Sequence, residues 1–356
     1  AEIFAGIDGI GRLSADLGNE GATAGGIAGL RGRAVEAVRA GRSVVGLWRL
    51  IRREGIEILH TSDRPRDALI TVLLGRLTGA RSIVHVHVLF LPWMGRALQW
   101  AIRSADARIA VSAFVADSLT GAGLEPTHVV LNAIETDRWT PGEGREDARA
   151  ELGIEPEAPT VVTACRLFPE KGVAELITAM AEVCQTVPEA RLVVVGRDTS
   201  SDGSYRRSLD ELVAASGLTD NVIFTGQRSD VPRLMAAGDV FAMPSFEEPF
   251  GLVFAEAMAM ELPVVALDNG GTREIVVNGE TGLLSQPGDH EALVDHLRSL
   301  LVDPERRAKL GAAGRHHVLT RFDVSRMAED TSAVYRQVLA DPTAVAVGSG
   351  SERGTQ

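Results

Sequence analysis

Residues 244–259 read PSFEEPFGLVFAEAMA, and this stretch decides the fold. The mostly apolar run 239–243 before it is typical of a strand buried on both faces, and Pro244 ends that strand. Gly251 begins a run of good helix formers with no further proline or glycine up to Met260. The pattern therefore predicts a buried strand, a tight loop and a helix, in that order.

The loop and helix start within this stretch suit an anionic ligand flanked by hydroxyl groups. The backbone N–H groups of Phe250, Gly251 and Leu252 lie at a predicted helix N-terminus, where unpaired donors and the helix dipole favour negative charge. Glu248 in the loop and Glu256 about a turn and a half into the helix can each accept two hydroxyl hydrogens. A nucleotide sugar combines a diphosphate with two polyols. The spacing alone also fits a surface loop with two solvated glutamates.

The complete sequence of this segment resembles a known family motif. Seven residues beginning Pro249-Phe250-Gly251 separate Glu248 from Glu256, as in the Glu-x7-Glu motif of retaining glycosyltransferases of the GT-B fold, family 4 in particular. The resemblance covers nearly the whole chain and is strongest in residues 160–290. It implies an α/β fold of two doubly wound parallel-sheet (Rossmann-like) domains that face an interdomain cleft. It also implies that Glu248 contacts the donor sugar and Glu256 the ribose hydroxyls.

Length, composition and charge narrow the functional class. The 356 residues are enough for two domains of ordinary size, and 45% hydrophobic residues support real cores. The formal net charge of −12 argues against nucleic acid as a main partner. Residues 1–150 carry a net charge of about +1 and the remainder about −13, so the first part better suits an anionic acceptor or a membrane surface.

The sequence indicates a cytoplasmic protein. No apolar run approaches the ~20 residues that a membrane-spanning helix needs, and no basic-then-apolar signal segment opens the chain. Cys165 and Cys184 have no CxxC or His-rich surroundings and are interpreted as buried thiols in a reducing compartment. We expect a cytoplasmic location with peripheral contact at the inner face of the membrane.

Strand and helix patterns alternate along the chain, which favours parallel doubly wound sheets. Because a strand-like segment already opens the chain at residues 1–5, we expect the first strand–helix unit of the fold to be missing. Predicted strands of the first domain include 56–60, 82–88 and 128–133. The predicted parts are an acceptor-side domain at 1–145, a donor domain at 146–320, a helix at 321–340 that crosses back to the first domain, and a disordered tail at 341–356.

A basic turn follows the first strand of the predicted donor domain. Arg166 and Lys171-Gly172 come after the buried strand 160–165, and Lys171 is one of only two lysines in the chain. A guanidinium can bind two phosphate oxygens at once, and an ammonium can reach one as a point charge. The Arg-x4-Lys-Gly wording resembles the pyrophosphate clamp of the family. A solvated basic turn is the alternative.

The resemblance also assigns residues at the ends of later strands. Gly196 and Gly226 end two predicted strands, and Gln227 and Arg228 stand where the family contacts the nucleobase. Open α/β sheets bind ligands at the C-terminal ends of their strands, which is where these four residues fall.

Two histidines follow a predicted strand of the first domain. His87 matches a family histidine near the donor sugar, although His85 has the same Val-His wording and the match can shift by two residues. A structural role is the alternative for either. No Asp-x-Asp metal motif occurs, so we expect no metal site and no cofactor besides the donor substrate.

An apolar stretch with two of the four tryptophans occupies residues 88–102, flanked by Arg96 and Arg103. Core packing explains such a stretch most simply. The alternative is a docking face for a lipid-linked acceptor or the membrane interface, with Trp93 at its centre.

The resemblance implies metal-independent transfer of a hexose from a nucleotide diphosphate sugar to an acceptor hydroxyl, with retention of anomeric configuration. Arg166, Lys171 and the amides at 250–252 are suited to stabilise the leaving diphosphate. The acceptor is expected to be a carbohydrate, a lipid-linked sugar or a small molecule. A non-catalytic nucleotide-sugar-binding protein and a GT-B epimerase share these features and stay open as alternatives.

Overall fold

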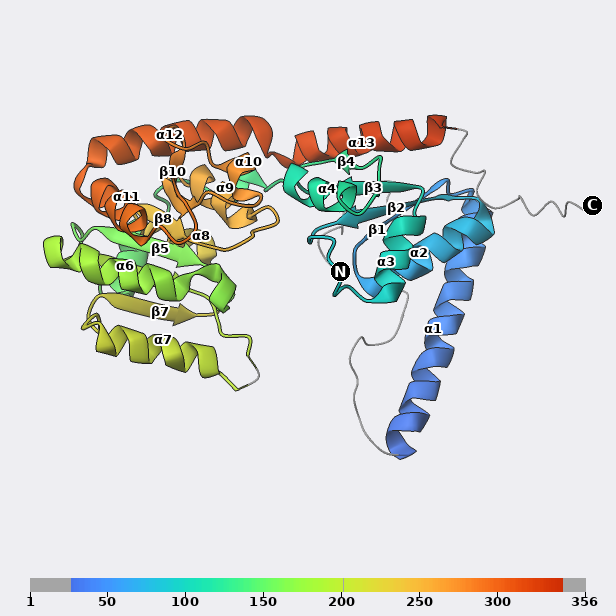
Figure 1. The fold of residues 1–356 in the computed structure, drawn as a ribbon, viewed down its shortest axis with the longest axis horizontal. Coiled ribbons are helices and arrows are strands. Elements are labelled where there is room, and N and C mark those ends of the chain that lie inside the picture. Colours follow the sequence, from blue (N-terminus) through green and yellow to red (C-terminus); the bar gives the residue numbers. More distant parts are fainter. Residues whose placement is uncertain (1–26, 201, 342–356) are drawn as a thin grey trace, which may run out of the picture. The chain divides into compact units, whose positions relative to one another are not determined.

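The computed structural model describes residues 27–200 and 202–341, with side chains of the first helix described from residue 39 on. The predicted strand at 1–5 and the predicted tail beyond Asp341 lie outside these residues. The described chain divides into two compact units (Figure 1). The first comprises residues up to His85 together with Pro92–Arg108 and the segment from Gln337 on, and the second comprises Val86–Leu91 and Ile109–Arg336.

The second unit contains a six-stranded parallel sheet of order β10-β9-β8-β5-β6-β7. Its strands are short and almost entirely apolar, as expected where helices cover both faces. Their bounds are β5 Thr160–Ala164, β6 Arg191–Val195, β7 Val222–Gly226, β8 Val240–Met243, β9 Val264–Leu267 and β10 Gly282–Ser285.

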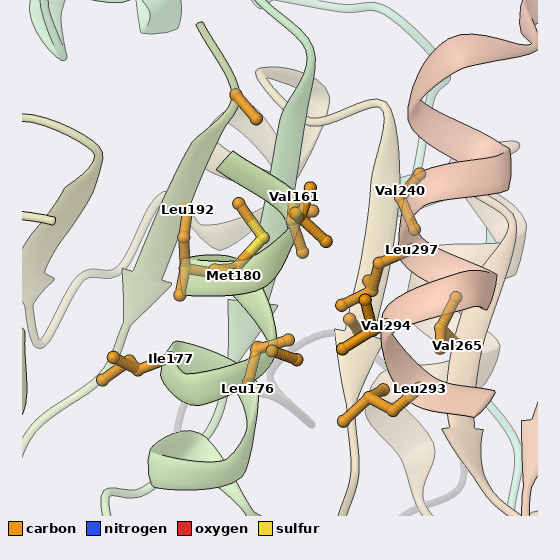
Figure 2. Packing of buried hydrophobic residues seen from close by; sticks show 14 of the residues in the cluster. Val161, Leu176, Ile177, Met180, Leu192, Val240, Val265, Leu293, Val294 and Leu297 are labelled. Carbon is orange, nitrogen blue, oxygen red and sulfur yellow. The ribbon is translucent and has the colours of Figure 1, made fainter. Parts of the chain in front are cut away.

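The helices in this part of the chain either connect these strands or, from α11 on, follow the last of them. Their bounds are α6 Val173–Thr186, α7 Ser204–Ala215, α8 Val231–Ala236, α9 Leu252–Ala259, α10 Thr272–Ile275, α11 His290–Val302, α12 Pro304–Arg321 and α13 Val324–Ala340. Figure 2 shows the core beneath α6 and α11, where Met180 lies beside the strand residue Val161 and Leu297 lies beside Val240. This buried cluster fixes the sheet whose C-terminal edge carries the candidate site.

The first four strands form a parallel sheet of order β1-β2-β3-β4. Their bounds are β1 Ile58–Ser62, β2 Arg81–Val86, β3 Ala107–Ala110 and β4 His128–Val129. The helices up to β4 are α1 Ile27–Glu54, α2 Pro65–Thr78, α3 Arg96–Ser104 and α4 Ala113–Thr120. A 3₁₀ turn at Thr136–Arg138 and the helix α5 Arg145–Glu151, which packs on α8, lie between β4 and β5, and a second 3₁₀ turn at Pro169–Lys171 follows β5. The two parallel sheets confirm the predicted α/β fold class.

Three predicted strand boundaries are wrong. The strand predicted at 56–60 lies two residues later, and the one predicted at 82–88 ends at Val86. The strand predicted at 128–133 ends at Val129, and one further hydrogen bond joins the N–H of Val130 to the carbonyl of Ala110 in β3 at 3.0 Å. Ile134 instead forms an isolated bridge with Asp323, and its N–H donates to the carbonyl of Phe322 at 2.9 Å.

Candidate active site

A pocket of about 460 Å³ opens at the C-terminal ends of β5 and β6 in the second unit. The chain runs from β5 outward through β6 and β7, then returns to β8 on the other side of β5, so β5 marks the point where the strand order reverses. Open α/β sheets bind ligands at such a point. The pocket is lined by Ala164, Cys165, Arg166, Val195, Gly196, Arg197, Thr199, Gln227, Arg228, Val231, Leu252, Val253 and Glu256.

The structure brings most of the predicted site residues to one edge of the sheet. Those that line the pocket are Arg166, Gly196, Gln227, Arg228, Leu252 and Glu256. Gly226 is joined to it because the N–H of Gly196 donates to the carbonyl of Gly226 at 2.9 Å. His87 follows β2, is half-buried, and is not among the described residues that line this pocket.

Lys171 and Glu248 form an ion pair beside the pocket. The Lys171 Nζ lies 2.5 Å from Glu248 Oε2, and the two side chains are only 21% and 12% exposed. The hydroxyl of Ser245 lies 3.1 Å from the same carboxylate oxygen and 3.2 Å from the carbonyl of Glu170. Water screens the attraction between opposite charges less when the pair is partly buried. The ion pair and the Ser245 hydroxyl therefore hold both side chains in place. Sequence reasoning missed Ser245, whose only signal is a hydroxyl three residues before Glu248.

The two loops that carry this ion pair touch at Gly172. Gly172 has φ +71°, and a Cβ built there would lie 2.1 Å from the carbonyl oxygen of Pro244. Gly196 is equally constrained, since its Cβ would lie 1.8 Å from the carbonyl oxygen of Cys165. Both distances are far below any real carbon contact. Glycine therefore permits the backbone approach that assembles the site.

The N-terminus of α9 adjoins the ion pair. Gly251 precedes the helix with φ +96°, and within the described chain the N–H groups of Gly251, Leu252 and Val253 donate to no backbone acceptor. Phe250 is buried and packs edge-to-face on Phe322 with ring centroids 5.8 Å apart, which anchors the loop. The helix start can therefore accept an anionic group.

Carboxylates at the other side of the pocket set its electrostatics. Burial raises the pKa of Glu256 from 4.5 to about 7, with Arg138 opposing the shift. Arg228 donates from Nε and Nη2 to Asp230, at 2.8 Å each, and from Nη1 to Glu151 at 2.9 Å. The hydrogen bonds from Arg228 lower the pKa of Asp230, and those from Arg233 and Arg228 lower the pKa of Glu151. The bonds also fix the orientation of the Arg228 guanidinium.

The floor of the pocket includes a thiol that sequence reasoning assigned only to the core. Burial raises the pKa of Cys165 to about 12, so the thiol stays neutral. Within the described residues, no group of three or more His, Cys, Asp or Glu side chains is placed to hold a metal ion.

Comparison with known proteins matches two sequence families. Residues 144–317 match the family described as Glycosyl transferases group 1, and residues 28–138 match Glycosyltransferase Family 4. The chain is similar to the lipopolysaccharide core biosynthesis mannosyltransferase LpcC of Rhizobium leguminosarum bv. viciae, with 31% identity over 84% of each chain. The corresponding enzyme LpsB of Rhizobium meliloti (strain 1021) is 33% identical over 68% of each chain.

Solved structures agree with the sequence families. The crystal structure of Anabaena HepE in complex with UDP and glucose is similar with a TM-score of 0.74, at 26% identity, covering 83% of this chain and 82% of that one. Sucrose-phosphate synthase from Thermosynechococcus elongatus gives a TM-score of 0.72 at 27% identity, covering 85% and 78%. These similarities confirm the predicted GT-B architecture. The chain belongs to the group 1 glycosyltransferases of family 4.

Proposed function

We propose that the protein moves a hexose from a nucleotide diphosphate sugar to an acceptor hydroxyl, with retention of anomeric configuration and without a metal ion. The observation that carries the proposal is the Lys171–Glu248 ion pair beside the N-terminus of α9, next to a pocket lined by Arg166 and Glu256. Cationic groups and amides suit the diphosphate, Glu248 suits the hexose, and Glu256 suits the ribose.

The proposed chemistry separates charge at the anomeric carbon. The bond from that carbon to the diphosphate breaks, and the leaving group gains negative charge. Arg166, Lys171 and the amides at the start of α9 are suited to stabilise it without reorganising. The acceptor oxygen forms the new bond on the same face of the sugar, and its proton passes to the leaving diphosphate. His87 remains a candidate for the reaction centre.

The donor that we test first is GDP-mannose. One relative, from Mycolicibacterium smegmatis, is named a GDP-mannose-dependent mannosyltransferase, whereas the Anabaena structures contain UDP and glucose. Calorimetric titration with GDP-mannose, UDP-glucose and ADP-glucose identifies the donor. Transfer of radiolabelled hexose to a lipid-linked or free sugar acceptor then supports a transferase. Binding without any product would indicate a sugar-nucleotide sensor, and a new epimer of the donor would indicate an epimerase.

The protonation of Glu256 predicts a pH-dependent affinity for the donor nucleotide. Its pKa of about 7 leaves the carboxyl protonated in acid, whereas ribose hydroxyls bind best to the ionised form. The Kd should therefore fall as pH rises, by roughly tenfold from pH 6 to 8. Calorimetry with the nucleoside diphosphate measures this slope. Glu256→Gln should flatten it, and an equal slope in that variant would contradict the role.

A surface of the first unit supports peripheral contact with a membrane. Within the described part of the chain, no helix is long and apolar enough to cross a bilayer. Residues 39–108 carry twelve arginines against five acidic residues. Trp93 is 73% exposed, in a loop held to α3 because Gln99 Nε2 donates to the carbonyls of Pro92 and Met94 at 3.2 and 2.6 Å. An exposed tryptophan in a segment rich in arginine suits an anionic lipid surface.

Replacing this tryptophan tests the contact. Trp93→Asp should abolish co-sedimentation with vesicles that contain phosphatidylglycerol, because it removes the exposed ring and adds a repulsive charge. Val302→Asp, at a 61% exposed apolar position on α11, is the matched control and should sediment like the wild type. Circular dichroism should show both variants folded. Unchanged sedimentation of Trp93→Asp would refute this membrane face.

A further inference from the structure

Ser112 and Glu274 join the start of α4 to a loop of the proposed donor site, and all of these residues belong to the second unit. Glu274 accepts hydrogen bonds from the backbone N–H groups of Ala113 and Phe114, at 2.8 and 3.0 Å, one on each carboxylate oxygen. The fully buried Ser112 hydroxyl donates to the carbonyl of Pro249 at 2.6 Å and accepts from the N–H of Val115 at 3.0 Å. A carboxylate at a helix N-terminus is favoured by both the free donors and the dipole.

The loop that Ser112 contacts is the sugar-side loop, residues 244–251, which carries Glu248. A turn at 268–271 packs against it so closely that only glycine fits. A Cβ at Gly270 would lie 2.7 Å from the carbonyl oxygen of Glu248, and one at Gly271 would lie 2.4 Å from that of Pro249. The N–H of Gly271 also donates to the carbonyl of Glu248 at 2.8 Å.

Glu274 lies on the short helix α10, three residues after Gly271, and a hydrogen-bonded arginine ties the turn together. The guanidinium of Arg273 donates to the carboxylate and the carbonyl of Asp268, at 2.7 and 2.6 Å. The turn therefore cannot shift without moving both Glu274 and the sugar-side loop. The bonds from α4 thus reach the loop twice, through Ser112 directly and through Glu274 by way of the turn.

We propose that Ser112 and Glu274 are positioning residues that set the place of the sugar-side loop, and with it the carboxylate of Glu248. The inference rests on the proposed function, since it concerns the loop that would hold the donor sugar. Ser112, Glu274 and residues 244–251 do not line the nucleotide pocket in the described chain. Replacing Ser112 or Glu274 is therefore expected to lower the turnover of the donor sugar without weakening the binding of the nucleotide. Misplacement of a reacting group by about 1 Å can cost a hundredfold in rate.

The test is Glu274→Gln in the full chain. The amide keeps one oxygen acceptor but turns an NH₂ group toward the second backbone N–H, so one of the two bonds is lost. We expect kcat for donor turnover to fall by about 10- to 100-fold, with the Kd of the nucleoside diphosphate unchanged within about twofold. Ser112→Ala should show the same split, and Ser112→Thr, which keeps the hydroxyl, should recover most of kcat.

Glu291→Gln is the matched control, because Glu291 is an exposed carboxylate in the first turn of α11, away from the loop. It should leave kcat unchanged. Unaltered kcat in Glu274→Gln and Ser112→Ala would overturn the proposal, as would parallel losses in kcat, nucleotide affinity and thermal stability. If the wild type itself turns over no nucleotide sugar, the proposed function fails. Native-state hydrogen exchange at the N–H groups of Phe246 and Gly271, which donate to the carbonyls of Glu170 and Glu248 at 2.8 Å each, then still tests the positioning role, which requires faster exchange in both variants.

Discussion

Lys171→Ala is expected to lower the turnover of the donor sugar by a hundredfold or more. Removal of one preorganised donor to a charge that develops in the transition state typically costs about 3–4 kcal/mol. Here the ammonium also neutralises Glu248 at 2.5 Å, so the variant leaves a half-buried carboxylate without its partner. Steady-state kinetics with the identified donor measures the loss.

The chain supplies its own control for this change. Lys309 is the only other lysine, and it lies exposed on α12. Lys309→Ala removes the same charge and should leave turnover unchanged. Lys171→Arg should retain part of the activity, because it keeps the charge but not the compact shape of the ammonium. Near-wild-type turnover in Lys171→Ala would contradict the assignment of Lys171 to the leaving diphosphate.

Gly172→Ala is expected to destabilise the second unit by about 3 kcal/mol or more and to abolish most activity. Its methyl group would lie 2.1 Å from the carbonyl oxygen of Pro244, so the backbone of the sugar-side loop must retreat. The same retreat pulls Glu248 away from Lys171. Chemical denaturation gives the change in the free energy of unfolding, and kinetics gives the loss of turnover.

Gly217→Ala separates steric clash from backbone strain. Gly217 has φ +69°, almost the same as Gly172, but nothing lies within 4 Å of the position that the new methyl group would take. The free energy of unfolding of this control should fall only by the strain of an alanine with positive φ, about 1–2 kcal/mol. Its activity should stay at the wild-type level. Equal losses in the two variants would show that the contact with Pro244 contributes nothing.

The six-stranded sheet was the most predictable part of the chain. Its strands are short apolar runs that end in glycine or proline, as at Gly196, Gly226 and Pro244, and these patterns depend only on neighbouring residues. The glycines at the strand ends also mark places where two backbone segments approach closely, as Gly196 does to the carbonyl of Cys165. The strand predicted at 128–133 is too long because its pairing with β3 ends at Val130, and the bridge from Ile134 to Asp323 depends on a distant segment.

Contacts between distant segments could not be read from the sequence. One of the three hydrogen bonds that orient Arg228 goes to Glu151, which is 77 residues away, and Ser112 reaches the sugar-side loop across 137 residues. Neither pair has a local pattern. The resemblance to a family indicated which residue types matter, but it carried no information on Ser245 or Glu151, which hold those residues in place. The roles of the site residues stay predictions until the variants are measured.

The neutral thiol of Cys165 in the lining of the nucleotide pocket affects which side reactions can occur there. A sulfur anion is a strong nucleophile, and an activated sugar is an electrophile. With a pKa of about 12, Cys165 is ionised in roughly one molecule in 10⁵ at pH 7. Self-glycosylation and oxidative capping at this sulfur are thereby suppressed, and the activated sugar is kept for the acceptor.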